Sequence, residues 1–169
     1  MIRYKKMERR SVALSVGPAG VEVRLPYGVS ARSPELRRFV AEQLAKAAAT
    51  APDDPDPARP LSRQQLCLEV AAWAARLGVS PNRTQVRAMT SRWGSCTSRG
   101  NLTFSRRTLE MPSSLRDYLI CHELTHLREL NHGPEFRRLM SAAMADWKRR
   151  EKALCGWVAR QELAALRRR

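Results

Sequence analysis

The sequence has no hydrophobic stretch long enough to cross a membrane, since no window of its 169 residues approaches the roughly 20 apolar residues that a spanning helix needs. A secretory signal is also missing. The basic start, residues 1–10, is followed by a stretch that Ser, Gly and Pro interrupt and that soon reaches Glu22 and Arg24. These absences argue against an exported or membrane-embedded protein, so we expect a cytoplasmic protein without a membrane partner.

Cysteine is scarce and scattered. No two of the four cysteines have the two-residue gap of a zinc knuckle or a redox pair; they are Cys67, Cys96, Cys121 and Cys155. This spacing argues against cysteine-based metal binding or thiol chemistry, and it favours free thiols in a reducing compartment.

Acidic residues are few as well: 16 Asp and Glu stand against 31 Lys and Arg, giving a formal net charge of +15. One interpretation is a surface that attracts nucleic acid or another polyanion. The other is a basic protein whose charge has no specific partner.

The chain has enough apolar residues, 43% of the total, to build the core of one domain. Alternating apolar residues over 12–25, around the turn Gly17–Gly20, predict a two-stranded hairpin with one buried face. Ser33 and Pro34 have the residue types of a helix start, and the apolar residues that follow, including Leu44, have helical spacing.

The second half alternates between helical and extended patterns. We expect a helix over 62–77 that Gly78 ends, strands over 85–90 and 102–106 with the turn-rich segment 91–101 between them, and a helix from Pro112 through Leu130. Further helix follows Pro134 towards the arginine-rich end. No internal repeat is found, and the order of elements predicts an α+β domain with a small antiparallel sheet packed on helices.

Residues 121–126, Cys-His-Glu-Leu-Thr-His, contain the pattern His-Glu-x-x-His within a predicted helix. Histidines four residues apart lie on one helix face, so His122 and His126 can bind one metal ion. Glu123 is rotated off that face but stays near a water on the metal. Zinc lowers the pKa of such a water to about 7, and Glu123 can accept its proton as general base. The motif therefore predicts a zinc hydrolase site.

A catalytic zinc needs a third protein ligand and an open position, and the remaining histidine of the chain is His132. In a continuous helix it would be rotated about 240° from His126, at about 100° per residue. The helix must therefore end near Leu130 or Asn131. Asn131 tolerates the left-handed conformation that ends helices, and Gly133-Pro134 prevents simple continuation. We predict that Zn²⁺ is the cofactor and that the three histidines bind it.

Metzincin proteases share this histidine spacing but have a glycine three residues after the second histidine. Glu129 occupies that position, which argues against a metzincin. Glu129 is either an acceptor that orients an imidazole or a solvated helix residue.

Three segments together closely resemble the bacterial YgjP-like metallopeptidase family, which is related to SprT and to Spartan/Wss-type proteases: Ser-Arg-Trp-Gly-Ser-Cys (91–96), Gly-Asn-Leu-x-Phe (100–104) and His-Glu-Leu-x-His-Leu-Arg-Glu-Leu-Asn-His-Gly-Pro-x-Phe (122–136). The resemblance implies a minigluzincin-like fold in which His122, His126 and His132 bind zinc and Glu123 is catalytic. The chain would then comprise an N-terminal hairpin and helix (1–50), a proline-rich linker (51–60), and a zinc metallopeptidase core with a basic C-terminal helix (61–169).

Positive charge is concentrated beside this predicted site. Residues 83–107 contain six arginines and no acidic residue, and residues 133–169 contain ten basic residues against four acidic ones. Trp93 lies within the first of these segments, either as a stacking platform for a nucleic-acid strand or as part of the core. The residues we expect to bind nucleic acid or phosphate are Arg92, Arg99, Arg106 and Arg107.

We favour a zinc-dependent peptidase that acts on peptide or protein substrates, with strand 102–106 presenting an edge to an extended peptide. Because the related proteases digest DNA-bound proteins, the basic surface suggests substrates associated with nucleic acid. One alternative is a metal-dependent nucleoside triphosphate pyrophosphatase, an activity also attributed to YgjP-like proteins, whose arginines would hold a triphosphate. Another is a nucleic-acid-binding module with a structural zinc, although such a site does not need Glu123.

Overall fold

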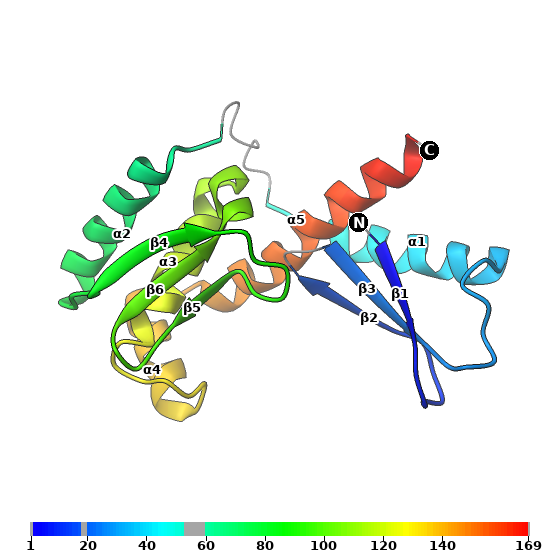
Figure 1. The fold of residues 1–169 in the computed structure, drawn as a ribbon, viewed down its shortest axis with the longest axis horizontal. Helices are drawn as coiled ribbons and strands as arrows, with labels where there is room; N and C mark the ends of the chain where they lie inside the picture. Colours follow the sequence, from blue (N-terminus) through cyan, green and yellow to red (C-terminus); the bar gives the residue numbers. More distant parts are fainter. Residues whose placement is uncertain (1, 18–19, 53–59, 169) are drawn as a thin grey trace. The chain divides into compact units, whose positions relative to one another are not determined.

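The computed structural model describes residues 2–17, 20–52 and 60–168. The chain forms two compact units, Met1–Pro52 with Lys152–Arg169, and Asp53–Glu151. Residues 152–169, which we expected in the metallopeptidase core, are in the same unit as the N-terminal residues. Most of the proline-rich segment 51–60 lies outside the described residues. The α+β class is confirmed, with helices and two small sheets (Figure 1).

The first unit contains a three-stranded sheet in the order β1-β3-β2. Strands β2 (Ala13–Gly17) and β3 (Gly20–Leu25) form the predicted antiparallel hairpin, while β1 (Ile2–Lys6), which we did not predict, pairs in parallel with β3. The buried side chains of β3 pack with the buried face of α1 (Pro34–Ala48) and with one residue of the C-terminal helix: Val21, Val23, Leu25, Leu36, Val40, Leu44 and Ala159.

Helix α1 begins as its sequence predicts, because the Ser33 side chain accepts a hydrogen bond from the Leu36 backbone N–H and Pro34 occupies the first turn. The C-terminal helix, α5 (Trp147–Arg167), passes close to the end of α1 at Gly156, where an added Cβ would lie 2.4 Å from the Ala51 backbone nitrogen. A glycine is therefore required at this approach.

The second unit begins with α2 (Arg63–Leu77), whose ends are also set by local signals. Ser62 and Gln65 form a reciprocal capping box, and Gly78 ends the helix in the left-handed conformation with φ 61°. Helix α3 (Ser113–Thr125) contacts α2. Arg116 of α3 donates to both carboxylate oxygens of Glu69 on α2, at 2.6 and 2.9 Å. These bonds fix the helix that carries the His-Glu-x-x-His motif against α2.

The sheet of the second unit has the order β4-β6-β5. Strand β4 (Arg83–Arg87) pairs in parallel with β6 (Asn101–Ser105), and β5 (Gly94–Cys96) pairs antiparallel with β6. The sheet is therefore mixed, not antiparallel as we predicted. Strand β5 lies in the segment expected to be only turns. Because β6 is the central strand, it has no free edge to which a peptide could add. Our expectation that strand 102–106 presents an edge to a peptide was therefore wrong, and the edge strands are β4 and β5.

The remaining helices follow the sheet along the chain. A 3₁₀ helix, η1 (Arg106–Glu110), leads into α3, and α4 (Pro134–Ala143) packs on α3. In the described ranges, no helix has the length and apolarity needed to cross a membrane. Among the described residues, no cysteine forms a disulfide bond.

Candidate active site

Three imidazoles converge at the end of α3. The Nε2 atom of His122 lies 3.2 Å from Nε2 of His126 and 3.1 Å from Nε2 of His132. The ligand atoms of the three residues all lie within 4.8 Å of one another, and no other group of three potential ligands of this kind is found among the described residues. The structure thus brings together the three predicted ligands.

Helix α3 ends earlier than we predicted. It stops at Thr125, with His126 as its C-cap, and a turn continues to Arg128. The predicted end near Leu130 or Asn131 was therefore wrong, and no described residue other than glycine has a positive φ, so Asn131 is not left-handed. The early end has the same consequence for the site, because it frees the chain after His126 to bring His132 back. Gly133 then caps α4, and Pro134 occupies its first turn.

Phe136 and Glu129 hold the imidazole rings. The buried ring of Phe136 lies 4.7 to 5.0 Å, centroid to centroid, from all three imidazoles. The Nδ1 of His126 is 3.0 Å from the backbone carbonyl oxygen of Glu129. Because a carbonyl only accepts, Nδ1 carries the proton and Nε2 keeps a free lone pair. The Glu129 carboxylate instead accepts from the Asn131 backbone N–H at 2.9 Å, so this residue orients an imidazole through its main chain.

The histidine pKa values match a metal site. Burial, together with the neighbouring His126 and His132, lowers the pKa of His122 to about 3. Burial likewise lowers the pKa of His126. Neutral imidazole is the form that binds a metal. The Nε2 separations of 3.1 and 3.2 Å are close to the edge of a tetrahedron, about 3.3 Å, for metal–nitrogen bonds of about 2.0–2.1 Å. The three histidines therefore fit a metal ion.

Glu123 lies beside the histidines with its side chain almost completely buried, at 4% exposure, and its Oε2 has no hydrogen-bond partner. Burial raises its pKa to about 8, an effect that the positive charge of Arg92 partly opposes. Gly94 of β5 packs directly on this side chain, since a Cβ at that position would lie 2.4 Å from Glu123 Oε1. A buried carboxyl with an open acceptor next to three convergent imidazoles can exchange protons with a bound water.

The model of the YgjP-like metallopeptidase domain matches residues 57–155, more than half of the chain. The chain belongs to the YgjP-like family. It is therefore a metallopeptidase, and the three clustered histidines indicate a metal ion as its cofactor. A search of curated proteins finds no match. Among solved structures, the chain is similar to the metallopeptidase zymogen of Pyrococcus abyssi abylysin, with 17% identity, a TM-score of 0.46, and coverage of 52% of this chain and 87% of that chain.

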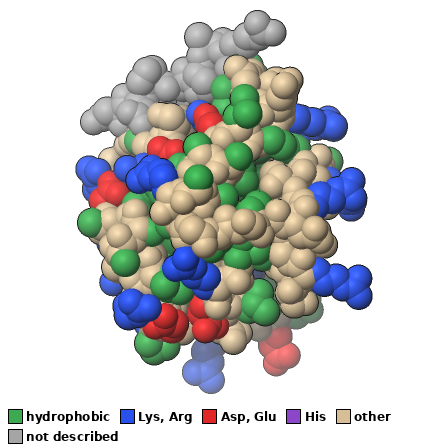
Figure 2. Space-filling model, turned by 90° about the vertical axis from the view of Figure 1, so that its left-hand side faces the viewer, with side chains coloured by type: hydrophobic (Ala, Val, Ile, Leu, Met, Phe, Trp, Pro, Cys, Tyr) green, Lys and Arg blue, Asp and Glu red, His purple; other side chains and the backbone are tan. Residues whose placement is uncertain are grey.

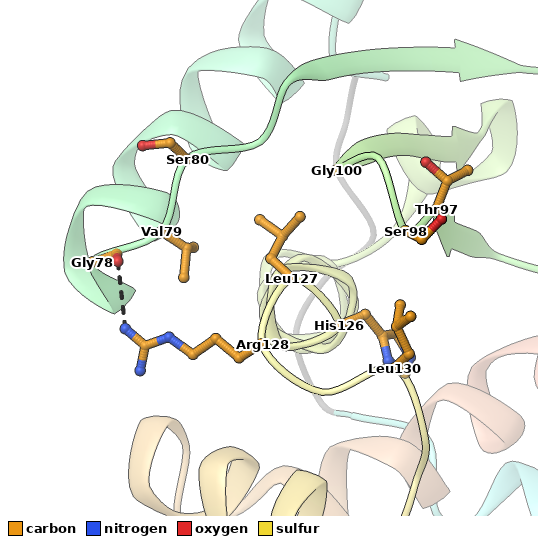
Figure 3. A pocket seen from close by; sticks show the side chains of 10 residues that line it. All are labelled: Gly78, Val79, Ser80, Thr97, Ser98, Gly100, His126, Leu127, Arg128 and Leu130. Carbon is orange, nitrogen blue, oxygen red and sulfur yellow. Dashed lines mark hydrogen bonds between the residues drawn. The ribbon is translucent and has the colours of Figure 1, made fainter.

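A groove opens beside the metal site of this YgjP-like domain (Figure 3). It has a volume of about 550 Å³ and is lined by three segments: the loop after α2 (Gly78, Val79, Ser80), the β5–β6 turn (Thr97, Ser98, Gly100) and the residues after α3 (His126, Leu127, Arg128, Leu130). We call it the Leu130 groove. Because the proposed ligand His126 forms part of its wall, the groove adjoins the metal site.

The four predicted phosphate-binding arginines do not form one cluster. One end of the β5–β6 hairpin is closed by a hydrogen bond from the Ser105 backbone N–H to the Trp93 carbonyl, and beside it lie Arg92, Arg106 and Arg107. Arg99 lies in the turn at the other end of the hairpin. Arg92, Arg99 and Arg106 are exposed. Figure 2, which views the molecule from the left-hand side of Figure 1, shows its Lys and Arg side chains scattered singly on that face.

Trp93 is half-buried, outside the buried core, and the guanidinium carbon of Arg107 lies 5.5 Å from its ring centroid. Burial lowers the pKa of Arg107. Gly94 and Phe136 are functional residues that we did not predict, although both lie in the motifs quoted above. Only the fold shows that Gly94 contacts Glu123 and that Phe136 contacts the imidazoles.

Proposed function

We propose that this protein is a zinc-dependent peptidase in which His122, His126 and His132 bind Zn²⁺ and Glu123 is the general base. The observation that supports this most is the position of His122 Nε2, 3.1–3.2 Å from Nε2 of His132 and His126, beside a buried carboxyl whose Oε2 lacks a partner. Three histidines leave a tetrahedral ion one open position, as catalytic zinc sites require.

Zinc held there supplies a positive charge that polarises a water molecule and favours the ionised form of Glu123. Glu123 accepts the proton of the attacking water and later donates it to the leaving amine, which is the standard cycle of a general base that becomes a general acid. Gly94 allows the strand to approach this carboxylate closely and limits where it can move.

We propose that the peptide lies along β5, and that Arg92 and its neighbours select substrates. Strand β5 is an edge strand whose Gly94 contacts Glu123, so a peptide added to this edge passes next to the base. The three arginines around Trp93 lie at the same end of β5 as Gly94, and no acidic residue occurs over 83–107. This charge favours proteins associated with nucleic acid. Replacing Arg92 and Arg106 by Ala should weaken binding to single-stranded DNA and reduce the salt dependence of that binding by about two charges; unchanged binding would remove this part of the proposal.

The ligand set is tested by metal content. His132→Ala should lose most of the one zinc per chain that the wild type binds after dialysis, while Asn131→Ala, an exposed neighbour, should keep it. Full zinc content in His132→Ala would overturn the ligand assignment.

The substrate class is tested by incubating the zinc-loaded protein separately with a mixed peptide library and with the common nucleoside triphosphates. We expect new peptide termini by mass spectrometry and no release of pyrophosphate. Triphosphate hydrolysis without peptide cleavage would replace the peptidase by a pyrophosphatase.

A further inference from the structure

The Leu130 groove adjoins the metal site at His126, which is the one candidate ligand among its lining residues. A peptide bound at the metal site would therefore lie close to the groove. Figure 3 shows Leu127 pointing into the space between Val79 and Ser98, so the groove has an aliphatic floor between two loops.

The groove walls combine aliphatic and hydroxyl groups. Leu127 and Leu130 provide apolar surface, and Leu130 is 51% exposed, while Ser80, Thr97 and Ser98 provide hydroxyl groups. Among the described residues that line the groove, none is acidic. The nearby Glu129 carboxylate is bonded to the Asn131 backbone N–H.

One cation lines the groove, and a second lies in a turn that borders it. Arg128 lies on its wall and donates to the backbone carbonyls of Leu77 and Gly78, so its charge faces carbonyl dipoles and not a carboxylate. Arg99 is exposed in the same turn as Ser98. A cationic substrate side chain would meet these charges with no compensating carboxylate among the lining residues, whereas a carboxylate or amide would be attracted or tolerated.

We propose that the Leu130 groove is a substrate-specificity subsite that accepts a glutamate or glutamine side chain and disfavours lysine and arginine. The aliphatic stem would lie on Leu127 and Leu130, and the carboxylate or amide would reach the hydroxyl groups and Arg128, with the positive charge of Arg99 in the adjoining turn. This inference rests on the proposed peptidase function, because it names which peptides that site selects.

The test uses fluorescent hexapeptides of alanine and glycine in which one residue, Glu, Gln or Lys, is moved through all six positions. At one position, the zinc-loaded wild type should cleave the Glu and Gln peptides with a kcat/KM at least about tenfold above that of the Lys peptide. Leu130→Glu places a carboxylate in the groove and should reverse this order. Leu68→Glu is the matched control, because Leu68 is also an exposed leucine, at 65%, and does not line the groove; it should behave as the wild type does.

Binding of the same peptides to Glu123→Gln, followed by fluorescence anisotropy, measures the groove without turnover. We expect the same preference and its reversal by the added Leu130→Glu change. If binding shows this pattern but no peptide is cleaved by the wild type, the peptidase proposal fails and the subsite stands. If peptides are cleaved but neither cleavage nor binding distinguishes Glu from Lys at any position, or Leu130→Glu leaves the order unchanged, the subsite is refuted and the peptidase stands.

Discussion

Gly94→Ala should disable the catalytic base without removing the metal. The added Cβ would lie 2.4 Å from Oε1 of Glu123 and 2.6 Å from its Cδ and Cγ, whereas an ordinary contact begins near 3.4 Å. Either the carboxyl or strand β5 must therefore move by about 1 Å, the difference between these distances. Misplacement of a reacting group by about 1 Å costs on the order of 100-fold in rate. We expect kcat to fall by about that factor, since only the geometry of Glu123 relative to the histidines has changed.

The measurements are zinc content, thermal unfolding and peptide hydrolysis of the wild type and the variant. The three atoms nearest to the added Cβ all belong to Glu123 and none to a histidine, so zinc content should remain one per chain. Gly28→Ala is the matched control, because a Cβ there meets nothing within 4 Å, and it should retain full activity. A folded, zinc-loaded Gly94→Ala protein with wild-type kcat would refute the assignment of Gly94 as the residue that positions Glu123.

Three further predictions concern the support of the site. Phe136→Ala removes the ring that contacts all three imidazoles, and zinc affinity measured by competition with a chelator should fall about tenfold or more. Glu69→Ala leaves the buried Arg116 guanidinium without its carboxylate partner. The free energy of unfolding, measured in urea, should fall by about 2 kcal/mol, which is less than for a fully buried ion pair because Glu69 is partly exposed. With zinc removed by a chelator, the Glu123 pKa of about 8 lies above that of the unfolded chain. The contribution of this carboxyl to the free energy of unfolding is therefore complete below about pH 4.5 and is lost as pH rises through 8. At pH 9, Glu123→Gln should be more stable than the wild type by about 2–4 kcal/mol.

Each of these has a contrary outcome. Phe136→Leu should keep more affinity than Phe136→Ala, and equal affinities for zinc in all three proteins would show that the ring does not position the ligands. A Glu69→Ala protein as stable as the wild type would mean that Arg116 is satisfied by the Met111 carbonyl alone. A stability difference between the wild type and Glu123→Gln that does not change between pH 5 and pH 9 would contradict the raised pKa.

Local signals predicted the start of α1 and both ends of α2. Ser33 and Pro34 start α1, and Ser62 and Gly78 bound α2, because caps and stops act on residues adjacent in the sequence. The sequence could not show that β1 and β5 are strands. Each is defined by pairing with a distant strand, and β5 consists of Gly-Ser-Cys within a stretch of turn-forming residues.

The end of α3 was overestimated for a different reason. Leu127 and Leu130 continue the helical spacing of apolar residues, but in the structure they line the Leu130 groove and do not extend the helix. The spacing of the three histidines, by contrast, predicted which residues meet. What holds them in place, the Phe136 ring and the Glu129 carbonyl, depends on tertiary contacts that no spacing encodes.

The most direct test of the account is peptide hydrolysis by zinc-loaded Glu123→Gln, measured beside the wild type with zinc content determined on the same samples. Gln is close in size to Glu and cannot accept the proton, so we expect one zinc per chain and a loss of kcat of at least about 100-fold. Hydrolysis at the wild-type rate by a fully loaded variant would contradict Glu123 as the general base, and with it the mechanism proposed for this site.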